Sequence, residues 1–405
     1  MRKFAWIAAV GGFVLWTAAA HSQNLPQRTI QYQALAEHIV AQLHLAPGEK
    51  VLSVAMPGLF SEIVPHLRYA VMKAGGVDLG VIEALQTPYP AAWDAKKLAA
   101  GLEASTQAYV KLLEDVDVVV MLPGVFAAHP AYRAYQRVLT ERKGTRRSLH
   151  FHWTDAYGAG ATDPGLTGVT IIPGQSAPAM QEIENVYQEA VLKTDYAALA
   201  AHQDRFIAAL RAGPVHVTTP LGTNLTFSVG DRLVIRQDGD ASAARAQTAT
   251  VLIEREVEIP AGPVRVAPIE NTVNGVLAYG PSRWNGRTAS GVKLTFAKGK
   301  LVSVKAETGL EAVKAELNAQ PEALRILREF TLGFHPHLMV PEVNPWVPYY
   351  GYGAGIVRLA LGNNREVGGA IGVPGRNYNR FNDLFIDCTI TLNGEVWVKD
   401  GKFVK

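Results

Sequence analysis

The N-terminal half of the chain alternates apolar runs with longer segments whose apolar residues recur at helical spacing. The helical segments are 31–45, 59–76 and 91–116, and the strand segments are 49–58, 77–85 and 117–124. The last strand segment, DVVVMLPG, contains an unbroken apolar run after its first residue, as expected of a parallel strand that is covered on both faces. This alternation predicts an α/β domain with an open, mostly parallel sheet.

The ligands of an open parallel sheet bind beyond the carboxyl ends of its strands. Two such ends carry Pro-Gly turns, in MPGLF and in MLPGVFAAHP, although each turn alone is more simply an ordinary loop. Neither GxGxxG nor GxxxxGK[ST] follows these strands. The sequence therefore argues against a nucleotide site.

The character of the sequence changes after two further helical segments, 176–193 and 195–213. Short alternating segments separated by turn residues follow, together with one predicted helix over 309–330. We therefore predict an N-terminal α/β domain over 23–213 and a β-rich α+β domain over 214–405.

The first 22 residues have the layout of a cleaved secretory signal. Arg2 and Lys3 precede an apolar run from Phe4 to Trp16, and small residues follow. The run is short for a bilayer-spanning helix, although a retained signal anchor is the alternative. Cleavage predicts a periplasmic or secreted protein that is not bound to a membrane. Its only cysteine, Cys388, can form no internal disulfide.

Composition excludes some classes of function. The formal net charge is +3 over 405 residues, and no cluster of Lys and Arg alternates with aromatic residues. Nucleic-acid binding is therefore not expected. No GxSxG motif is present and Cys388 has no histidine near it in the sequence, so nucleophilic catalysis has no support.

Six separated segments of the second half follow one another as in one family of metallopeptidases. They are VHVTTPLGTNLTFSVGDR, EIPAGPVRVAPIENTVNGVLAYG, GVKLTFAKGKLVSVKAETGLEAVKAEL, REFTLGFHPHL, LALGNN and LNGEVWVKDGKFV. Over most of residues 28–405 the chain resembles the aminopeptidase T family, whose fold is shared by the 2,5-dihydroxypyridine dioxygenases, which are iron enzymes. The resemblance implies an α/β domain, a β-rich domain with a metal site in a cleft, aminopeptidase activity and a homodimer.

Most of the metal ligands implied by this resemblance are replaced, while Glu329 and Asp383 are retained. Pro263 stands where the family has a Glu ligand, and Arg358 where it has a His. Arg365 stands in place of a Tyr ligand, and Phe381 in place of a second His. Proline and phenylalanine carry no donor atom, and arginine stays protonated. Two carboxylates are too few for a tight transition-metal site, so we expect no metal cofactor.

Without a dication, Glu329 and Asp383 would be two like charges in one site, and one of them would be protonated unless a cation replaced the metal. The planar guanidinium of Arg358 suits that role, because it can bridge two carboxylates. We predict that these three residues form the catalytic centre. The alternative is that Arg358 points to solvent.

His335 and His337, in FHPHLMVPE, offer another possibility. Two histidines at i and i+2 point the same way on an extended strand. With Glu329 or Asp383 they would form a mononuclear site for one divalent metal such as iron, as in a dioxygenase. The simpler interpretation is a loop whose histidines form local hydrogen bonds.

The segment VNPWVPYYGYGAG places aromatic residues among prolines and glycines, which suits stacking on a flat or extended ligand. Two arginines that follow it would hold a carboxylate. The predicted ligand-binding residues are His335, His337, Trp346, Tyr349, Tyr350, Arg376 and Arg380. An aromatic dimer contact or plain loop packing is the alternative.

Two functions remain open. One is a secreted enzyme, related to aminopeptidase T or to the dioxygenases, that acts on a small peptide-like or aromatic carboxylate ligand although the two-metal site is largely lost. The other is a metal-free periplasmic binding protein or pseudoenzyme. In both cases the partner is a small molecule or a peptide.

Overall fold

The computed structural model describes residues 30–85, 89–142, 144–153, 170–172, 174–376, 378–380 and 383–405. The predicted signal, 1–22, and Phe381 lie outside these residues. Within the described part of the chain, no helix has the length and apolar character needed to cross a membrane.

The first sheet has five parallel strands in the order β2-β1-β3-β4-β9. Its strands are β1 (Lys50–Ala55), β2 (Val77–Glu83), β3 (Val118–Met121), β4 (Arg147–Phe151) and β9 (Glu256–Ile259). Strands β3 and β4 are buried along their whole length, which is why the sequence of β3 is apolar without alternation. The predicted parallel sheet is confirmed.

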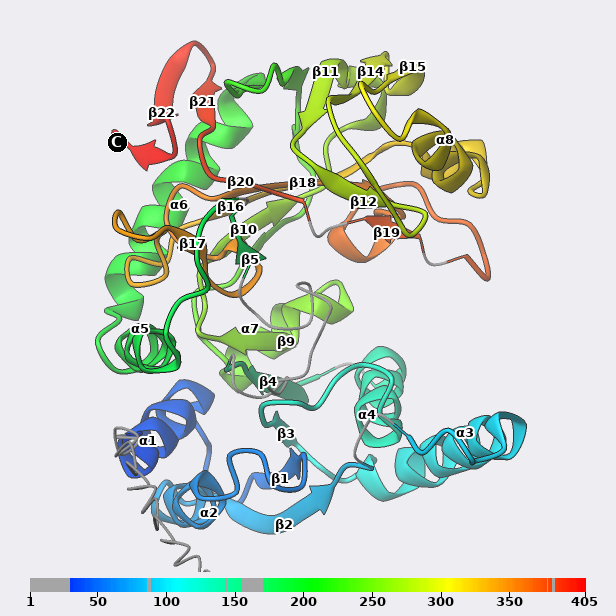
Figure 1. The fold of residues 1–405 in the computed structure, drawn as a ribbon. Helices are drawn as coiled ribbons and strands as arrows, with labels where there is room; N and C mark the ends of the chain where they lie inside the picture. The colour runs from blue at the N-terminus through cyan, green and yellow to red at the C-terminus, as the bar shows by residue number, and fades with distance from the viewer. Residues whose placement is uncertain are drawn as a thin grey trace, which may run out of the picture.

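Helices cover both faces of this sheet (Figure 1). They are α1 (Tyr32–Leu43), α2 (Ile63–Lys73), α3 (Ala95–Leu113), α4 (Pro130–Glu141) and α5 (Met180–Leu192). Val118 and Val120 of β3 pack with α1, α2 and α5, whereas Val119 and Met121 pack with α3 and α4. Because successive side chains of a strand point to opposite faces, β3 contributes residues to a hydrophobic core on each face of the sheet. Helix α4 and strand β4 were not among the elements predicted from the sequence.

Most of the second half forms antiparallel sheets. The eight-stranded sheet has the order β15-β14-β11-β7-β6-β21-β22-β23, and a six-stranded sheet has the order β19-β18-β16-β10-β8, with β20 also paired to β18. Helix α6 (Tyr196–Ala212) packs on both through Leu199, Phe206 and Leu210. The mixed α/β class predicted from the sequence is confirmed in this broad form.

The strands of the eight-stranded sheet are β6 (Val215–Thr218), β7 (Asn224–Phe227), β11 (Asn274–Tyr279), β14 (Val292–Ala297), β15 (Lys300–Lys305), β21 (Thr389–Leu392), β22 (Glu395–Lys399) and β23 (Lys402–Phe403). The six-stranded sheet is formed by β8 (Val234–Arg236), β10 (Pro263–Val266), β16 (Leu327–Gly333), β18 (Val357–Gly362), β19 (Asn379–Arg380) and β20 (Leu384–Phe385). Two two-stranded sheets pair β5 (Thr170–Ile171) with β17 (Trp346–Val347), and β12 (Ser282–Trp284) with β13 (Arg287–Ala289).

The single helix predicted over 309–330 is wrong. Helix α8 (Leu310–Asn318) ends before Pro321, and the chain then enters strand β16. Proline cannot continue a helix because it lacks the N–H group and its ring clashes with the preceding turn. Glu329 therefore lies in a buried strand.

Strand β9 comes from beyond the predicted boundary at residue 213, yet it pairs in parallel with β4. Ile259 at its end lies opposite Phe151, and the chain then passes through Pro260 into β10 of the six-stranded sheet. The division into 23–213 and 214–405 remains a prediction, but one strand of the second segment completes the sheet of the first. The carboxyl ends of β4 and β9 consequently lie next to the start of β10.

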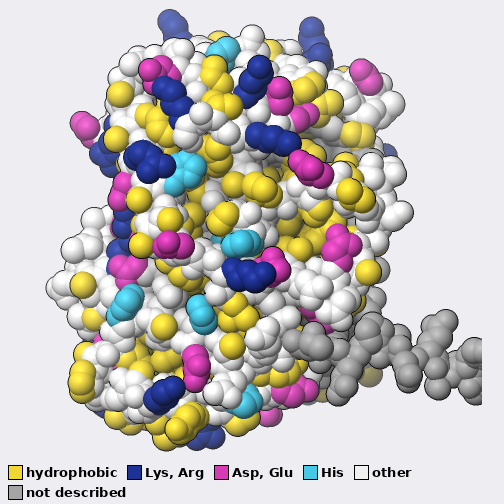
Figure 2. Space-filling model, turned by 90° about the vertical axis from the view of Figure 1, so that its left-hand side faces the viewer, with side chains coloured by type: hydrophobic (Ala, Val, Ile, Leu, Met, Phe, Trp, Pro, Cys, Tyr) yellow, Lys and Arg dark blue, Asp and Glu magenta, His cyan; other side chains and the backbone are white. Residues whose placement is uncertain are grey.

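Figure 2 shows one face of the molecule in space-filling form. Lys and Arg side chains are interspersed there with Asp and Glu side chains and with hydrophobic ones. The described part of this face therefore carries no continuous basic surface of the kind that binds nucleic acid.

Candidate functional site

Glu329 in β16 has 0% of its surface exposed, and three guanidinium groups contact its carboxylate. Arg265 Nη2 and Arg328 Nη1 donate to Oε2 at 2.9 and 3.1 Å, and Arg358 Nη2 donates to Oε1 at 2.8 Å. The Thr331 hydroxyl donates to Oε1 at 3.0 Å. Both carboxylate oxygens are therefore engaged by donors.

The register of three neighbouring strands assembles this cluster. Thr331 of β16 lies opposite Arg265 of β10 on one side and opposite Arg358 of β18 on the other. Residues two apart on a strand share a face, so Glu329 lies in the same layer as Thr331. The arginines thus reach one carboxylate from separate strands.

Electrostatics within the cluster favour the charged forms. Burial alone would raise the pKa of Glu329, but Arg265, Arg358 and Arg328 outweigh it and hold that pKa well below its usual value of 4.5. Burial would likewise lower the pKa of Arg265, and the Glu329 carboxylate reverses this effect. The site is therefore a buried ion cluster at neutral pH.

Arg358 was predicted to bridge Glu329 and Asp383, and the structure differs from this prediction. Asp383 is paired instead with Arg380, whose Nε lies 2.8 Å from Oδ2 and whose Nη2 donates to Oδ1 at 3.1 Å. The register places Leu384 opposite Arg358, so the Asp383 side chain points to the other face of β20. Glu329 and Asp383 therefore contact different arginines.

Arg380 was predicted to hold a ligand carboxylate, but it is occupied within the protein. Besides Asp383 it bonds Glu316 Oε1 at 3.1 Å, and its guanidinium carbon lies 3.4 Å from the ring centre of Trp284. The other predicted arginine, Arg376, is exposed. Neither forms an ion pair with Glu329 in the described part of the chain.

His335 and His337 do not present free ring nitrogens to a common point. His335 is buried, and its Nδ1 accepts the backbone N–H of His337 at 3.2 Å. Its Nε2 therefore carries the proton and donates to the Ala190 carbonyl at 3.1 Å, with the Thr194 hydroxyl also at 3.1 Å. Burial lowers the pKa of His335 to about 3. This neutral imidazole is held by local hydrogen bonds and has no lone pair left for a metal.

The aromatic residues proposed to stack on a ligand mostly belong to the core. Trp346 is buried and donates from Nε1 to Glu182 Oε1 at 3.0 Å. Tyr349 is also buried, and its backbone N–H donates to the Tyr187 hydroxyl at 2.9 Å. Tyr350 is half-buried. Its side chain is thus the only one of the three predicted stacking residues with appreciable exposure.

The donors around Glu329 do not fit a divalent metal. Guanidinium groups occupy both carboxylate oxygens, and a cation placed there would meet three fixed positive charges. Pro263 is buried without a donor, Arg365 is exposed, and Phe381 lies outside the described residues. In the ranges that the structure describes, no group of three or more His, Cys, Asp or Glu side chains is suited to a metal.

Arg265 and Arg328 were not identified from the sequence. Arg265 lies between Val264 and Val266 in a fully buried strand, and Arg328 directly precedes Glu329. An arginine flanked by valines in a buried strand needs an anionic partner, because charged residues are almost never buried unpaired. An arginine between two valines is therefore the sequence pattern that could have identified Arg265 as part of the site.

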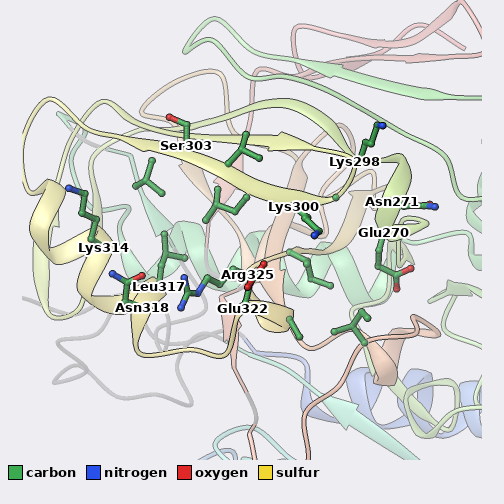
Figure 3. Close-up of a pocket in the computed structure, with 17 residues that line it drawn as sticks. Glu270, Asn271, Lys298, Lys300, Ser303, Lys314, Leu317, Asn318, Glu322 and Arg325 are labelled. Carbon is green, nitrogen blue, oxygen red and sulfur yellow. The ribbon is translucent and has the colours of Figure 1, made fainter.

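A separate hollow of about 790 Å³ lies between β15 and α8 (Figure 3). Lys298, Lys300, Lys314 and Arg325 lie around it, but none of the residues that contact Glu329 lines it. Lys314 is paired with Glu311 and Arg325 with the Gln320 carbonyl. This hollow is distinct from the Glu329 cluster.

The parallel sheet and the antiparallel sheets define a mixed α/β protein. The family described as thermophilic metalloprotease (M29) matches residues 194–338. Wild-type AmpT from Thermus thermophilus is similar over 92% of this chain and 99% of its own, with 18% identity and a TM-score of 0.58. The resemblance to the aminopeptidase T family predicted from the sequence is confirmed.

A second structure has the same fold. The 2,5-dihydroxypyridine dioxygenase from Pseudomonas putida KT2440 matches 92% of this chain and 97% of its own, with 14% identity and a TM-score of 0.56. A search of curated proteins found no match. At these identities the two structures establish the fold, while function depends on the site.

Proposed function

We propose that this chain is an aminopeptidase T-like protein that binds the carboxylate of a small peptide or aromatic acid at Arg265 and Arg358 without a resident metal. The observation that carries the proposal is the fully buried Glu329, held by three arginines where the family resemblance implies a metal ligand. In this proposal Arg358 replaces the dication, and the family's two-metal site is lost.

Arg265 retains a hydrogen-bond donor for a ligand. Arg265 and Arg358 are 8% and 4% exposed, and among the described residues the buried Nε of Arg265 has no hydrogen-bond partner. A guanidinium group has five N–H donors, of which one carboxylate takes two. A planar carboxylate is therefore the ligand group that these side chains match.

The same groups also bear on catalysis. Fixed guanidinium groups stabilise an oxyanion that develops from an amide carbonyl, as a dication does. They do not lower the pKa of a bound water to near neutrality, which is a metal's other contribution to hydrolysis. We therefore place ligand binding ahead of hydrolysis in this protein. Export to the periplasm or medium and assembly as a homodimer are further parts of the proposal.

Elemental analysis tests the metal-free site. Protein purified without added metal is expected to contain well under one equivalent of zinc, cobalt, manganese or iron, because arginines occupy the carboxylate oxygens of Glu329. Stoichiometric metal that survives dialysis against a chelator would contradict the proposal. In that event, loss of the metal in His335→Ala or in His337→Ala would identify the rearranged site.

Titration calorimetry tests the ligand. Glycyl-phenylalanine or phenylacetate is expected to bind at millimolar concentration or below, and Arg265→Met is expected to weaken binding at least tenfold, since it removes a charge-assisted pair. Arg376→Met, at an exposed arginine, is the matched control and should leave the affinity unchanged. Absence of binding by every carboxylate tested would refute the proposal.

A further inference from the structure

The hollow between β15 and α8 has a largely aliphatic lining (Figure 3). Its larger aliphatic residues are Leu301, Val302, Val304, Leu317, Ile326 and Ile371. Leu317 is a buried core residue, and Leu301 and Val304 are partly buried and pack against the same core. The volume of about 790 Å³ falls within the range of about 300 to 1,000 Å³ that is usual for small-molecule sites. The hollow therefore has room for a ligand with an apolar part.

A β-bulge in β15 directs two aliphatic side chains into this hollow. Leu301 lies opposite Phe296 and Val304 lies opposite Leu294, with Val302 as the extra residue between them. Phe296 and Leu294 are buried. Residues directly opposite each other in an antiparallel pair share a face, so Leu301 and Val304 both turn toward the core that α8 covers. In a regular strand, residues three positions apart would point to opposite faces.

The lining distinguishes between kinds of apolar ligand. Among the described residues, no aromatic side chain lines the hollow. A flat ring is bound best by stacking on other aromatic rings, which this hollow does not provide. Aliphatic side chains pack on a flexible hydrocarbon chain just as well, because hydrophobic burial has no preferred direction. The lining therefore favours an aliphatic chain over an aromatic ring.

Basic side chains outnumber acidic ones around the hollow. The basic residues are Lys298, Lys300, Lys314 and Arg325, and the acidic ones are Glu270 and Glu322. Glu270 is occupied, since it pairs with Arg232 and its Oε1 accepts a hydrogen bond from Asn364 Nδ2 at 2.8 Å. Lys314 pairs with Glu311. Three basic groups and one acidic group are left, so the hollow attracts an anion.

Two of the remaining basic groups have donors available to a ligand. Lys300 is exposed, and in the described part of the chain no ion pair or hydrogen bond engages its ammonium group. Its side chain extends from β15 toward the segment that carries Glu322 and Arg325 (Figure 3). Arg325 donates from Nε and Nη2 to the Gln320 carbonyl at 3.1 and 2.9 Å, which orients the guanidinium group and leaves Nη1 unused among the described residues. Both groups can pair with one carboxylate.

We propose that this hollow binds a medium-chain aliphatic carboxylate, of which decanoate is an example. The chain packs on Leu301, Val304 and Leu317, and the carboxylate pairs with Lys300 and Arg325. This site is separate from the Glu329 cluster, and the proposal does not depend on the proposed function. An anionic phospholipid shares the same chemistry, so the ligand has to be tested both as a monomer and as a membrane surface.

Titration calorimetry at pH 7 with monomeric ligands tests the aliphatic chain and the charge. Hexanoate is expected to bind at least about tenfold more weakly than decanoate, because each buried CH₂ group contributes up to about fourfold. Decyltrimethylammonium, which has the same chain and the opposite charge, is also expected to bind at least about tenfold more weakly. Equal affinities for decanoate and either of the other two ligands, or no binding of decanoate, would overturn the proposal.

Variants locate the site. Lys300→Met is expected to weaken decanoate binding about two- to fivefold, and Lys300→Met with Arg325→Gln at least about tenfold. Glu322→Gln should strengthen binding about twofold, since it removes a like charge. Lys305→Met, at an exposed lysine of the same strand outside the hollow, is the matched control and should leave the affinity unchanged.

The melting temperature of each variant shows that it is folded. Unchanged affinity in the Lys300→Met, Arg325→Gln double variant would overturn the proposal, as would displacement of decanoate by saturating phenylacetate, which would place decanoate at the Glu329 cluster.

Two measurements test the other occupants of such a surface. Co-sedimentation with vesicles of phosphatidylglycerol, without binding of monomeric decanoate, would overturn the proposal in favour of a membrane surface. Val302 in the bulge is 59% exposed. A dimer in sedimentation velocity that Val302→Lys dissociates, again without decanoate binding, would overturn the proposal in favour of a second copy of the chain.

Discussion

Glu329→Gln is expected to lower the free energy of unfolding at pH 7 by about 3 to 5 kcal/mol, the usual cost of removing one partner from a buried ion cluster. The change leaves Arg265 and Arg358 buried without their shared anion. Arg358→Met should cost less, about 1 to 3 kcal/mol, because two guanidinium groups still contact the carboxylate. Urea unfolding at pH 7 measures both.

The effect of Glu329→Gln should depend on pH. The folded pKa of Glu329 lies well below 4.5, so its contribution is present above the unfolded pKa and is lost as the pH falls through the folded value. Parent and variant should therefore converge in acid, as long as both remain folded. Glu366→Gln is the control: this glutamate pairs with Arg328 but is 51% exposed, and its loss should cost no more than about 1 kcal/mol. A Glu329→Gln protein as stable as its parent at pH 7 would contradict the buried cluster.

Glu256→Gln is expected to have the opposite effect and to stabilise the protein at pH 8 and above by about 2 to 4 kcal/mol. The folded pKa of Glu256, about 8, lies above its usual value of 4.5. Its contribution is complete below the unfolded pKa and is lost as the pH rises through the folded value. The amide avoids this loss and can still accept the hydrogen bond from Gln136.

Thermal unfolding followed from pH 4 to pH 9 checks this result. The curves of parent and variant should separate as the pH rises above 5. Asp383→Asn serves as a comparison, because burial raises the pKa of that carboxyl against the opposing effect of Arg380. Parallel stability curves for Glu256→Gln and its parent would show that the Glu256 carboxyl ionises normally.

The sequence predicted the elements whose signals are local. The helices and strands up to β3 were predicted from the spacing of their apolar residues. The proximity of Glu329 and Arg358 was predicted from the resemblance to the family. The helix predicted through Pro321 failed because the apolar residues of a buried strand such as LREFTLG can also be fitted to helical spacing. A short apolar run does not distinguish the two structures.

Contacts that depend on strand register could not be predicted. Asp383 pairs with Arg380 because β20 pairs with β18 in one particular register. His152 and Glu258 are separated by more than one hundred residues and meet only because β9 joins the edge of β4. Such pairings depend on long-range topology, for which the sequence offers no periodic signal.

The position of β9 also affects how the protein unfolds and whether its N-terminal part can fold alone. A fragment that ends at residue 213 would lack β9 and leave the backbone of β4 unpaired at the edge of the sheet. Because every residue of β4 is buried in the intact chain, that fragment would expose unpaired strand backbone of the kind that templates aggregation. We therefore expect the two halves to unfold together in one transition, and limited proteolysis near residue 213 to release no independently soluble N-terminal piece.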